Sequence, residues 1–563
     1  MNRSIYLFTP LEIINRKRYL SFGAKTMCKE VFLTGFSLLL VPVLLFANFS
    51  EKVQTKIFCG HDIQMDRFEK GLMPPPRPWG GIGPKVINST HFRIHFDTTG
   101  THATTRAYAE SVKVYAETSW ARASRLGWVM PPPDNNRGGD NRYDIYIQDL
   151  VGYLGVCIED SAYTDPYPDG YSSWVEIENT FTSWNRLRAL VAHEFHHSCQ
   201  KRYSQFENDP QRYFYENTSV YMEHVIFPDT NTLLGRLSES PSHLLTPHWA
   251  ITVRDELYYN FHYSGGLWAW FLHEYYDATP CRPMIRIWDL CGMHAGSHTR
   301  LDTDSVLRIY YDSNFQKAVG HYAIWRYFTG IRHSPYYFSD DSSYITSTIL
   351  RTHSTYPASG NQGTSNPSGP GGCNFIEFRN FGNNRVTLYF DGQNGYEWSA
   401  YVIGKRGGIS YEYKISLEPT QDTGRITIPG WEYDTIALIP VVTHWTSSAE
   451  SLTYSYNVTL GDELAAITEP TNVYFDLTLD IYPNPVKTQT TIKYSIPVSK
   501  NGKLKIYDAT GRAVCNFELM GNKRPASILW DKKDDFGQMI KSGIYFVRLM
   551  VDDKTISKKM VIE

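Results

Sequence analysis

The chain has 563 residues, and its 55 lysines and arginines nearly balance 58 aspartates and glutamates, giving a formal net charge of -3. This length exceeds what one hydrophobic core usually organises, so we expect two to four domains. The balanced charge, without a long basic run, argues against nucleic acid as a partner. Aromatic residues make up 15% of the chain, which is typical of β-rich domains with half-buried surfaces.

An apolar run at 31–46, VFLTGFSLLLVPVLLF, predicts a secretory signal. It is shorter than the about 20 residues that a membrane-spanning helix needs. Leu45 and Ala47 fit the -3 and -1 positions of a cleavage site, so we predict a signal peptide at 1–47. The long stretch before Met27 suggests that the true start is Met27, and an uncleaved anchor is the alternative. After cleavage we expect no stable membrane span.

The cysteines predict no dense disulfide scaffold. Cys28 lies in the signal, which leaves seven cysteines in the mature chain, a number that cannot pair completely. Export permits disulfides, but no C-x-x-C metal motif is present. We therefore predict no particular bridge.

Alternating and helical patterns follow each other in the first large segment. HFRIHFD at 91–97 and YDIYIQDL at 143–150 alternate as strands do, and 172–177 is a further expected strand. Apolar residues at helical spacing predict a helix over 104–126, ended by the loop PPPDNNRGGDN. This mixture predicts an α+β domain.

The segment RALVAHEFHHSCQKRY contains an H-E-x-x-H pattern from His193 to His197. On a helix these two histidines lie one turn apart on the same face, so both imidazoles can reach one Zn²⁺ at about 2.0–2.1 Å. Glu194 would then adjoin the metal and act as general base, while zinc polarises the scissile carbonyl. A separate apolar stripe supports the helix: Leu187, Val191, Phe195 and Cys199.

A third zinc ligand is expected at Glu216, eighteen residues after His197, in the helical segment RYFYENTSVYMEHVIF. This spacing resembles that of the gluzincin metallopeptidases, and of their zinc aminopeptidase branch in particular. In that branch the ligand lies in an E-G-x-x-x-x-x-E-like helix. Glu216 and Glu223 have the same separation here, although Asn217 replaces the glycine. No G-A-M-E-N-like strand precedes His193, so an endopeptidase is expected rather than an aminopeptidase.

Residues 85–460 contain, in this order, the motifs HFRIHFDTTG, GGDNRYDIYIQDL, AHEFHH and YSGGLWAWFLHEYYD, and this layout resembles that of a family of secreted bacterial metalloproteases. The resemblance implies zinc more firmly than it implies a substrate. Gluzincins often stabilise the oxyanion with a downstream tyrosine or histidine. Tyr259, His262 and Tyr263 lie in the matching window, and we favour Tyr263.

Other polar residues near these motifs are expected to have structural roles. Glu223 is predicted to support a ligand or to lie on a solvated helix face rather than to bind metal itself, and His196 and His224 are expected to pack or to face solvent. Asp140 and Asp144 in GGDNRYD offer oxygens for Ca²⁺ but lack the full D-x-D-x-D-G pattern, so we expect a solvated turn.

The polar stretch SGNQGTSNPSGPGG at 359–372 predicts a linker. The runs VTLYFDG, SAYVIGK, GRITIPG and IALIPVV that follow are typical of a β-sandwich. After a second junction, the tail carries four motifs: Tyr482-Pro483-Asn484-Pro485, Asp508-Ala509-Thr510-Gly511-Arg512, Trp530-Asp531 and Ser542-Gly543-Ile544-Tyr545-Phe546. Their order resembles the C-terminal sorting domain of the bacterial type IX secretion pathway. The alternative is a plain Ig-like adhesion module.

Together these patterns predict a multidomain protein, an α+β zincin-like metallopeptidase domain followed by two all-β Ig-like sandwiches. The expected segments are a signal peptide (1–47), an entry segment (48–84), the peptidase domain (85–358), a linker (359–372), a β-sandwich (373–461), a linker (462–477) and the sorting domain (478–563). We expect a secreted or cell-surface zinc peptidase of a Gram-negative-type bacterium, acting on protein or peptide substrates and exported by the type IX secretion machinery. The alternative is a non-catalytic surface-binding protein that retains the peptidase fold.

Overall fold

The computed structural model describes most of the chain after the predicted signal peptide. The described residues are 57–61, 63–64, 70, 77–78, 85–181, 183–204, 213–253, 259–277, 279–294, 301–340, 343–361, 365–419, 422–445, 451–461, 467–475, 477–496, 501–520, 526–551 and 554–563. The signal peptide, its cleavage after Ala47, the start at Met27 and most of 48–84 therefore lie outside the described residues. Within the described part, no helix is long and apolar enough to cross a membrane.

A six-stranded sheet in the order β1-β5-β6-β4-β3-β2 forms one layer of the first domain. Its strands are β1 (Ile57–Cys59), β2 (Lys85–Asn88), β3 (Phe92–Phe96), β4 (Tyr143–Gln148), β5 (Tyr153–Ala162) and β6 (Tyr171–Glu178). β3, β4 and β6 confirm the three strands predicted from alternation and run parallel to one another. β5 is antiparallel to β6, and its other edge pairs with β1.

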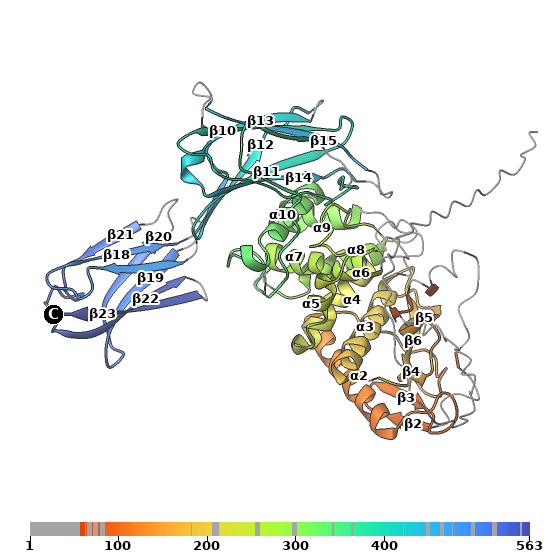
Figure 1. The fold of residues 1–563 in the computed structure, drawn as a ribbon. Helices are drawn as coiled ribbons and strands as arrows, with labels where there is room; N and C mark the ends of the chain where they lie inside the picture. Colours follow the sequence, from red (N-terminus) through yellow and green to blue (C-terminus); the bar gives the residue numbers. More distant parts are fainter. Residues whose placement is uncertain are drawn as a thin grey trace, which may run out of the picture. The chain divides into compact units, whose positions relative to one another are not determined.

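Helices form the rest of this domain, and α2 and α3 lie beside the sheet (Figure 1). They are α2 (Arg106–Leu126), α3 (Trp184–Tyr203), α4 (Tyr213–Ile226), η1 (Pro228–Thr230), α5 (Thr232–Ser238), α6 (Tyr259–Ser264), α7 (Gly266–Tyr276), α8 (Arg282–Met293), α9 (Leu301–Tyr311), α10 (Phe315–Tyr327) and η3 (Gly330–Arg332). α2 confirms the predicted helix. It begins where the Thr105 side chain accepts a hydrogen bond from the Tyr108 amide, and it ends at Gly127, whose φ of 99° is left-handed.

α3 is the central helix of the domain, because side chains from Ala189 to Tyr203 are buried on every face. The predicted apolar stripe packs toward the sheet and α2, with the Phe195 ring 5.5 Å from Phe92 and 5.8 Å from Trp120. The face that carries His193 and His197 is turned toward α4. Burial on all sides fixes the direction of each polar side chain on α3.

Two further sheets form the predicted middle sandwich, in the orders β13-β10-β15-β8 and β16-β12-β11-β14-β9-β7. Their strands are β7 (Arg351–His353), β8 (Ala358–Asn361), β9 (Ile376–Phe378), β10 (Arg385–Gly392), β11 (Trp398–Arg406), β12 (Ile409–Ile415), β13 (Thr423–Pro429), β14 (Thr435–Val442), β15 (Tyr454–Leu460) and β16 (Asn472–Phe475), with η4 (Gly430–Glu432) before β14. The four apolar runs singled out in the sequence are β10, β11, β13 and β14.

The two predicted linkers are wrong in part. β8 contains the first residues of the 359–372 segment and pairs with β15, and β16 lies within 462–477 and pairs with β12. Gly371 and Gly372 are buried, and a Cβ on Gly372 would lie 2.6 Å from the His248 carbonyl oxygen. The glycines thus permit close packing of the backbone, whereas composition alone indicated a flexible spacer.

The C-terminal domain has a three-stranded sheet, β17-β18-β21, and a four-stranded sheet, β20-β19-β22-β23. The strands are β17 (Thr478–Tyr482), β18 (Thr490–Ser495), β19 (Asn501–Asp508), β20 (Ala513–Met520), β21 (Ala526–Trp530), β22 (Gly543–Val551) and β23 (Lys554–Ile562). The tail motifs lie at the ends of strands: the first three follow on from β17, β19 and β21, and the last begins β22. Asp508 accepts hydrogen bonds from the amides of Thr510 and Arg512, and Gly511 has a φ of 86°. These residues fix the loop between β19 and β20.

Candidate metal centre

Four buried side chains converge between β1, α3 and α4. Cys59, His193, His197 and Glu216 each offer one ligand atom, and these atoms all lie within 4.8 Å of one another. His193 Nε2 lies 3.1 Å from His197 Nε2 and 3.0 Å from Glu216 Oε2, and His197 Nε2 lies 3.5 Å from Glu216 Oε1. The structure therefore brings together the three ligands predicted from the sequence, and Cys59 is an addition.

The spacing of these atoms fits a small cation. Donors that each lie about 2.0–2.1 Å from a tetrahedral zinc are about 3.3 Å apart, close to the separations observed here. Both Glu216 carboxylate oxygens are buried without a hydrogen-bond partner of good geometry in the described part of the chain. Two imidazoles, a thiol and a carboxylate are also the donor types that zinc prefers. The residues present therefore fit zinc.

Hydrogen bonds to the far ring nitrogens orient both histidines. Glu223 Oε1 lies 2.8 Å from His193 Nδ1, and Gln200 Oε1 lies 2.6 Å from His197 Nδ1. Gln200 is fixed in turn, because its amide nitrogen donates to Thr218 Oγ1 at 2.6 Å. Carboxylate or amide oxygens on Nδ1 leave Nε2 free to bind a metal. Glu223 thus occupies the supporting position predicted for it.

The electrostatics of the cluster favour a positive charge at its centre. Burial alone would lower the pKa of His193, but the Glu216 and Glu223 carboxylates raise it to about 10. Burial alone would raise the pKa of Glu216, but His197 and His193 hold it well below its usual range. In the absence of a metal the site therefore retains a proton, and a bound cation would compete with that proton.

Glu194 lies beside this cluster, next to the Cys59 thiol. Its carboxylate is fully buried, and neither oxygen has a hydrogen-bond partner of good geometry among the described residues. Burial raises the pKa of Glu194 to about 8, opposed by His193 and the neighbouring Cys59 thiol. Gly155 on β5 leaves room for the side chain, since a Cβ there would lie 2.9 Å from Glu194 Cγ.

The candidate oxyanion residues lie at different distances from the cluster. The Tyr263 ring is buried with its centroid 6.0 Å from that of His193, and its hydroxyl donates to the Cys59 carbonyl at 3.5 Å. His262 is buried behind Tyr263, with ring centroids 5.2 Å apart. Tyr259 begins α6, and its side chain lies outside the described part of the structure. Of Tyr263 and His262, Tyr263 is the one whose ring contacts a predicted ligand, His193.

His196 and His224 are packing residues, as predicted. His196 is fully buried with its ring edge-on to Trp128 at 4.4 Å. Burial, with His197 and His193 nearby, lowers its pKa well below the usual value. His224 packs against Trp270 at 4.8 Å.

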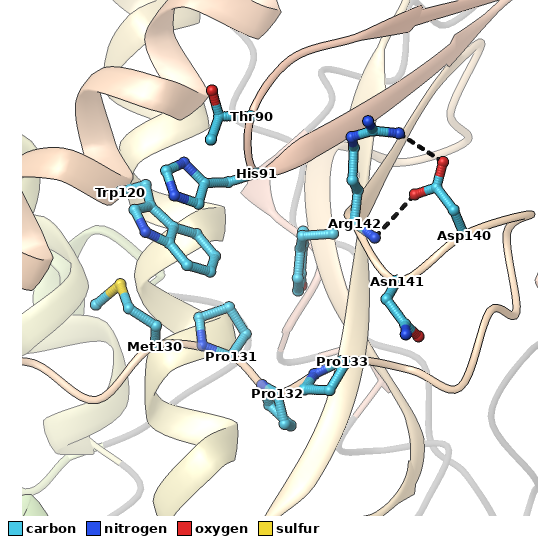
Figure 2. Close-up of a pocket in the computed structure, with 11 residues that line it drawn as sticks. Thr90, His91, Trp120, Met130, Pro131, Pro132, Pro133, Asp140, Asn141 and Arg142 are labelled. Atoms are coloured by element: carbon cyan, nitrogen blue, oxygen red, sulfur yellow. Dashed lines mark hydrogen bonds and ion pairs between the residues drawn. The ribbon is translucent and has the colours of Figure 1, made fainter.

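The expected solvated turn is confirmed for the loop of Asp140, which is mostly exposed over 135–142, but it is wrong for Asp144, which lies on β4. Asp144 is buried, lies 2.5 Å from Arg77 Nη1 and 2.7 Å from His95 Nε2, and so has two cationic or hydrogen-bonding partners. Asp140 binds Arg93 and Arg142, and Figure 2 shows its contacts with Arg142 at the rim of a pocket of about 610 Å³. Both aspartates therefore form ion pairs with arginines.

The tail defines the class of protein. Residues 480–563 match the family model of the secretion system C-terminal sorting domain, which confirms the prediction for 478–563. This domain marks proteins exported by type IX secretion in Bacteroidetes. The chain is therefore exported to the cell surface or secreted, and its tail interacts with the secretion machinery.

Comparison with solved structures adds only distant likenesses. Dimeric latent PorU from Porphyromonas gingivalis is 18% identical over 31% of this chain and 18% of that chain, with a TM-score of 0.15. PorZ, a surface component of the type IX secretion system of the same organism, is 12% identical over 29% and 22%, with a TM-score of 0.13. Ruminococcus gnavus β-glucuronidase is 11% identical over 34% of each chain, with a TM-score of 0.11. This chain thus spans a minor part of these proteins. No curated protein matches it.

Sequence reasoning missed Cys59 as a member of the cluster. The residue lies 138 positions from His197 and near no recognisable ligand motif, so no local spacing connects them. The odd number of cysteines in the mature chain was the one available signal, and it did not single out Cys59.

Proposed function

We propose that this protein is a zinc-dependent peptidase, with a zincin-like catalytic domain, that cleaves protein or peptide substrates at or outside the cell surface. The observation that carries the proposal is the convergence of three ligand groups: His193 Nε2 and His197 Nε2 lie 3.1 Å apart, and each lies within 3.5 Å of one oxygen of the Glu216 carboxylate. Zinc bound there would supply a Lewis acid that polarises the scissile carbonyl and makes the attacking water more acidic.

The residues around the metal have separate tasks in this proposal. The Glu194 carboxylate takes a proton from the attacking water and delivers it to the leaving amine nitrogen. Its burial favours this role, because a carboxylate with a raised pKa holds the proton long enough to pass it on. The Tyr263 hydroxyl is the candidate donor to the oxyanion. Glu223 and Gln200 keep the two imidazoles aimed at the metal.

A second candidate is a non-catalytic surface protein with a structural metal. One observation favours it: Cys59 offers a fourth protein ligand, and structural zinc sites are closed by four such ligands. The buried Glu194 carboxylate favours the enzyme, since a structural site needs no uncompensated carboxylate beside it.

The test measures metal content and casein hydrolysis of the full chain and of its Cys59→Ser variant. We expect about one zinc per chain, and cleavage by at least one of the two proteins that stops on chelation and returns with added Zn²⁺. Glu194→Gln, introduced into the active form, should keep its zinc and lose nearly all hydrolysis because only the base is neutralised. One bound zinc without cleavage in either protein would contradict the peptidase and support the structural site.

A further inference from the structure

The segment 57–61 covers the candidate metal centre. Phe58, Cys59 and His61 are all buried, with 9%, 0% and 3% of their surface exposed. The Phe58 ring meets His193 edge-on at 5.4 Å, and the His61 ring stacks on His197 at 4.9 Å. The segment therefore fills the space around both ligand imidazoles, where a substrate would have to approach.

Backbone pairing holds this segment in place. β1 pairs in parallel with the outer edge of β5, with Ile57 opposite Tyr153 and Cys59 opposite Gly155. The Gly60 amide extends the pairing by donating to the Gly155 carbonyl at 2.7 Å. Among the described strands, β1 alone pairs with this edge of β5. An extended peptide could otherwise add to the same edge by β-augmentation.

The Cys59 thiol points at the ligand nitrogens. Its Sγ lies 3.5 Å from His197 Nε2, and it belongs to the four-residue cluster within 4.8 Å. We propose that Cys59 is the fourth protein ligand of the zinc, and that the segment 57–61 thereby keeps the peptidase latent. This inference rests on the proposed function. A catalytic zinc needs one position open for water, and the Cys59 sulfur would occupy that position.

Two observations favour a removable inhibitor over a permanent structural ligand. The other three ligands come from α3 and α4 in the domain core, whereas Cys59 comes from a three-residue strand at the sheet edge. Glu194 also remains buried beside the site without a hydrogen-bond partner of good geometry. Burying such a carboxylate costs folding free energy, and a role as catalytic base explains why the protein retains it. Displacing 57–61 would leave His193, His197 and Glu216, the three-ligand set of a catalytic zinc.

The N-terminal segment has a second anchor at Arg77. Its guanidinium is buried and lies 2.5 Å from Asp144, 2.6 Å from Asp134 and 2.7 Å from Asp160. The guanidinium also lies 5.2 Å from the centre of the Trp174 ring. The ion pairs of Arg77 with three carboxylates therefore hold residue 77 against the first domain. This is the domain whose candidate metal centre is covered by Cys59.

X-ray absorption at the zinc edge tests the ligand independently of activity. Full-length zinc-loaded protein should show one sulfur at about 2.3 Å together with nitrogen and oxygen donors at about 2.0–2.1 Å. Cys59→Ser should keep one zinc per chain and lose the sulfur shell. Cys281→Ser, a change at another buried cysteine of the same domain, should keep it. A shell of nitrogen and oxygen alone in the unmodified protein would overturn the assignment of Cys59.

Casein hydrolysis by the same proteins tests latency. Cys59→Ser should be at least tenfold more active than the full chain, and Cys281→Ser should match the full chain. A sulfur shell with equal activity in the full chain and in Cys59→Ser would refute the inhibitory role while leaving the peptidase intact. A sulfur shell with no activity in either protein would instead refute the proposed function, and latency with it.

Discussion

The hydrogen bond between Glu223 and His193 predicts how much the residues around the proposed metal ligands would contribute to zinc affinity. Glu223 Oε1 lies 2.8 Å from His193 Nδ1, and Arg236 Nη2 lies 3.4 Å from the same oxygen. Outer-shell partners of ligand histidines typically contribute 10- to 100-fold in metal affinity. Glu223→Gln preserves an oxygen that accepts from Nδ1 and removes only the charge, so we expect about a tenfold loss. Glu223→Leu removes the acceptor as well, so we expect about a hundredfold loss, or about 2.8 kcal/mol.

The assay is zinc competition against a chromophoric chelator at fixed pH, with Glu110→Gln as the control. Glu110 is a carboxylate of the same domain that pairs with Arg106 and Lys113 on the surface of α2. The control should bind zinc as the unmodified chain does. Equal affinity for all three variants would show that Glu223 does not orient a zinc ligand, and it would refute our interpretation of the cluster.

Three further predictions concern the base, a buried carboxylate and the tail. Gly155→Ala in the Cys59→Ser background should lower kcat about tenfold at unchanged zinc content, because the new Cβ would displace the Glu194 side chain. Gly235→Ala is the control, since a Cβ there would meet nothing within 4 Å. A Gly155→Ala variant with the same kcat as its Cys59→Ser parent would contradict the role of Glu194. Burial raises the pKa of Asp134 to about 6, so its charge opposes folding as pH rises from about 4 through 6. Asp134→Asn should therefore raise Tm at pH 8 and have little effect near pH 4, as calorimetry at the two pH values can check. A lower Tm at pH 8 would show that the Asp134 charge stabilises the folded protein instead. Deleting residues 480–563 in the Cys59→Ser background should leave casein hydrolysis unchanged and retain the protein in the periplasm, as cell fractionation can show; normal export of the truncated chain would refute the sorting role.

The sequence predicted the parts of the site that depend on local periodicity. His193 and His197 are one helical turn apart, so their convergence needs only that α3 be a helix. The prediction of Glu216 required a second helix, and the eighteen residues between His197 and Glu216 indicated where its ligand would lie. The position of Glu223 on His193 follows from the same helix, since two turns of α4 bring it to the other side of the ring.

The features that sequence did not predict are contacts between distant segments. Cys59 reaches His197 because β1 joins the edge of β5, and strand pairing of this kind has no signal in a three-residue strand. Asp144 was expected in a solvated turn, yet a guanidinium from residue 77 buries it. The glycines of 359–372 were read as a spacer, although at Gly371 and Gly372 they permit close packing. In each case the contact depends on a residue far away in the sequence, which local composition and spacing do not identify.

Anomalous diffraction at the zinc absorption edge, on crystals of the full chain, tests the central claim most directly. We predict one strong peak within about 2.0–2.3 Å of His193 Nε2, His197 Nε2, a Glu216 oxygen and the Cys59 sulfur. An empty cluster in crystals grown with zinc, or a peak elsewhere with these four side chains hydrogen-bonded only to one another, would contradict the metal centre and the peptidase built on it.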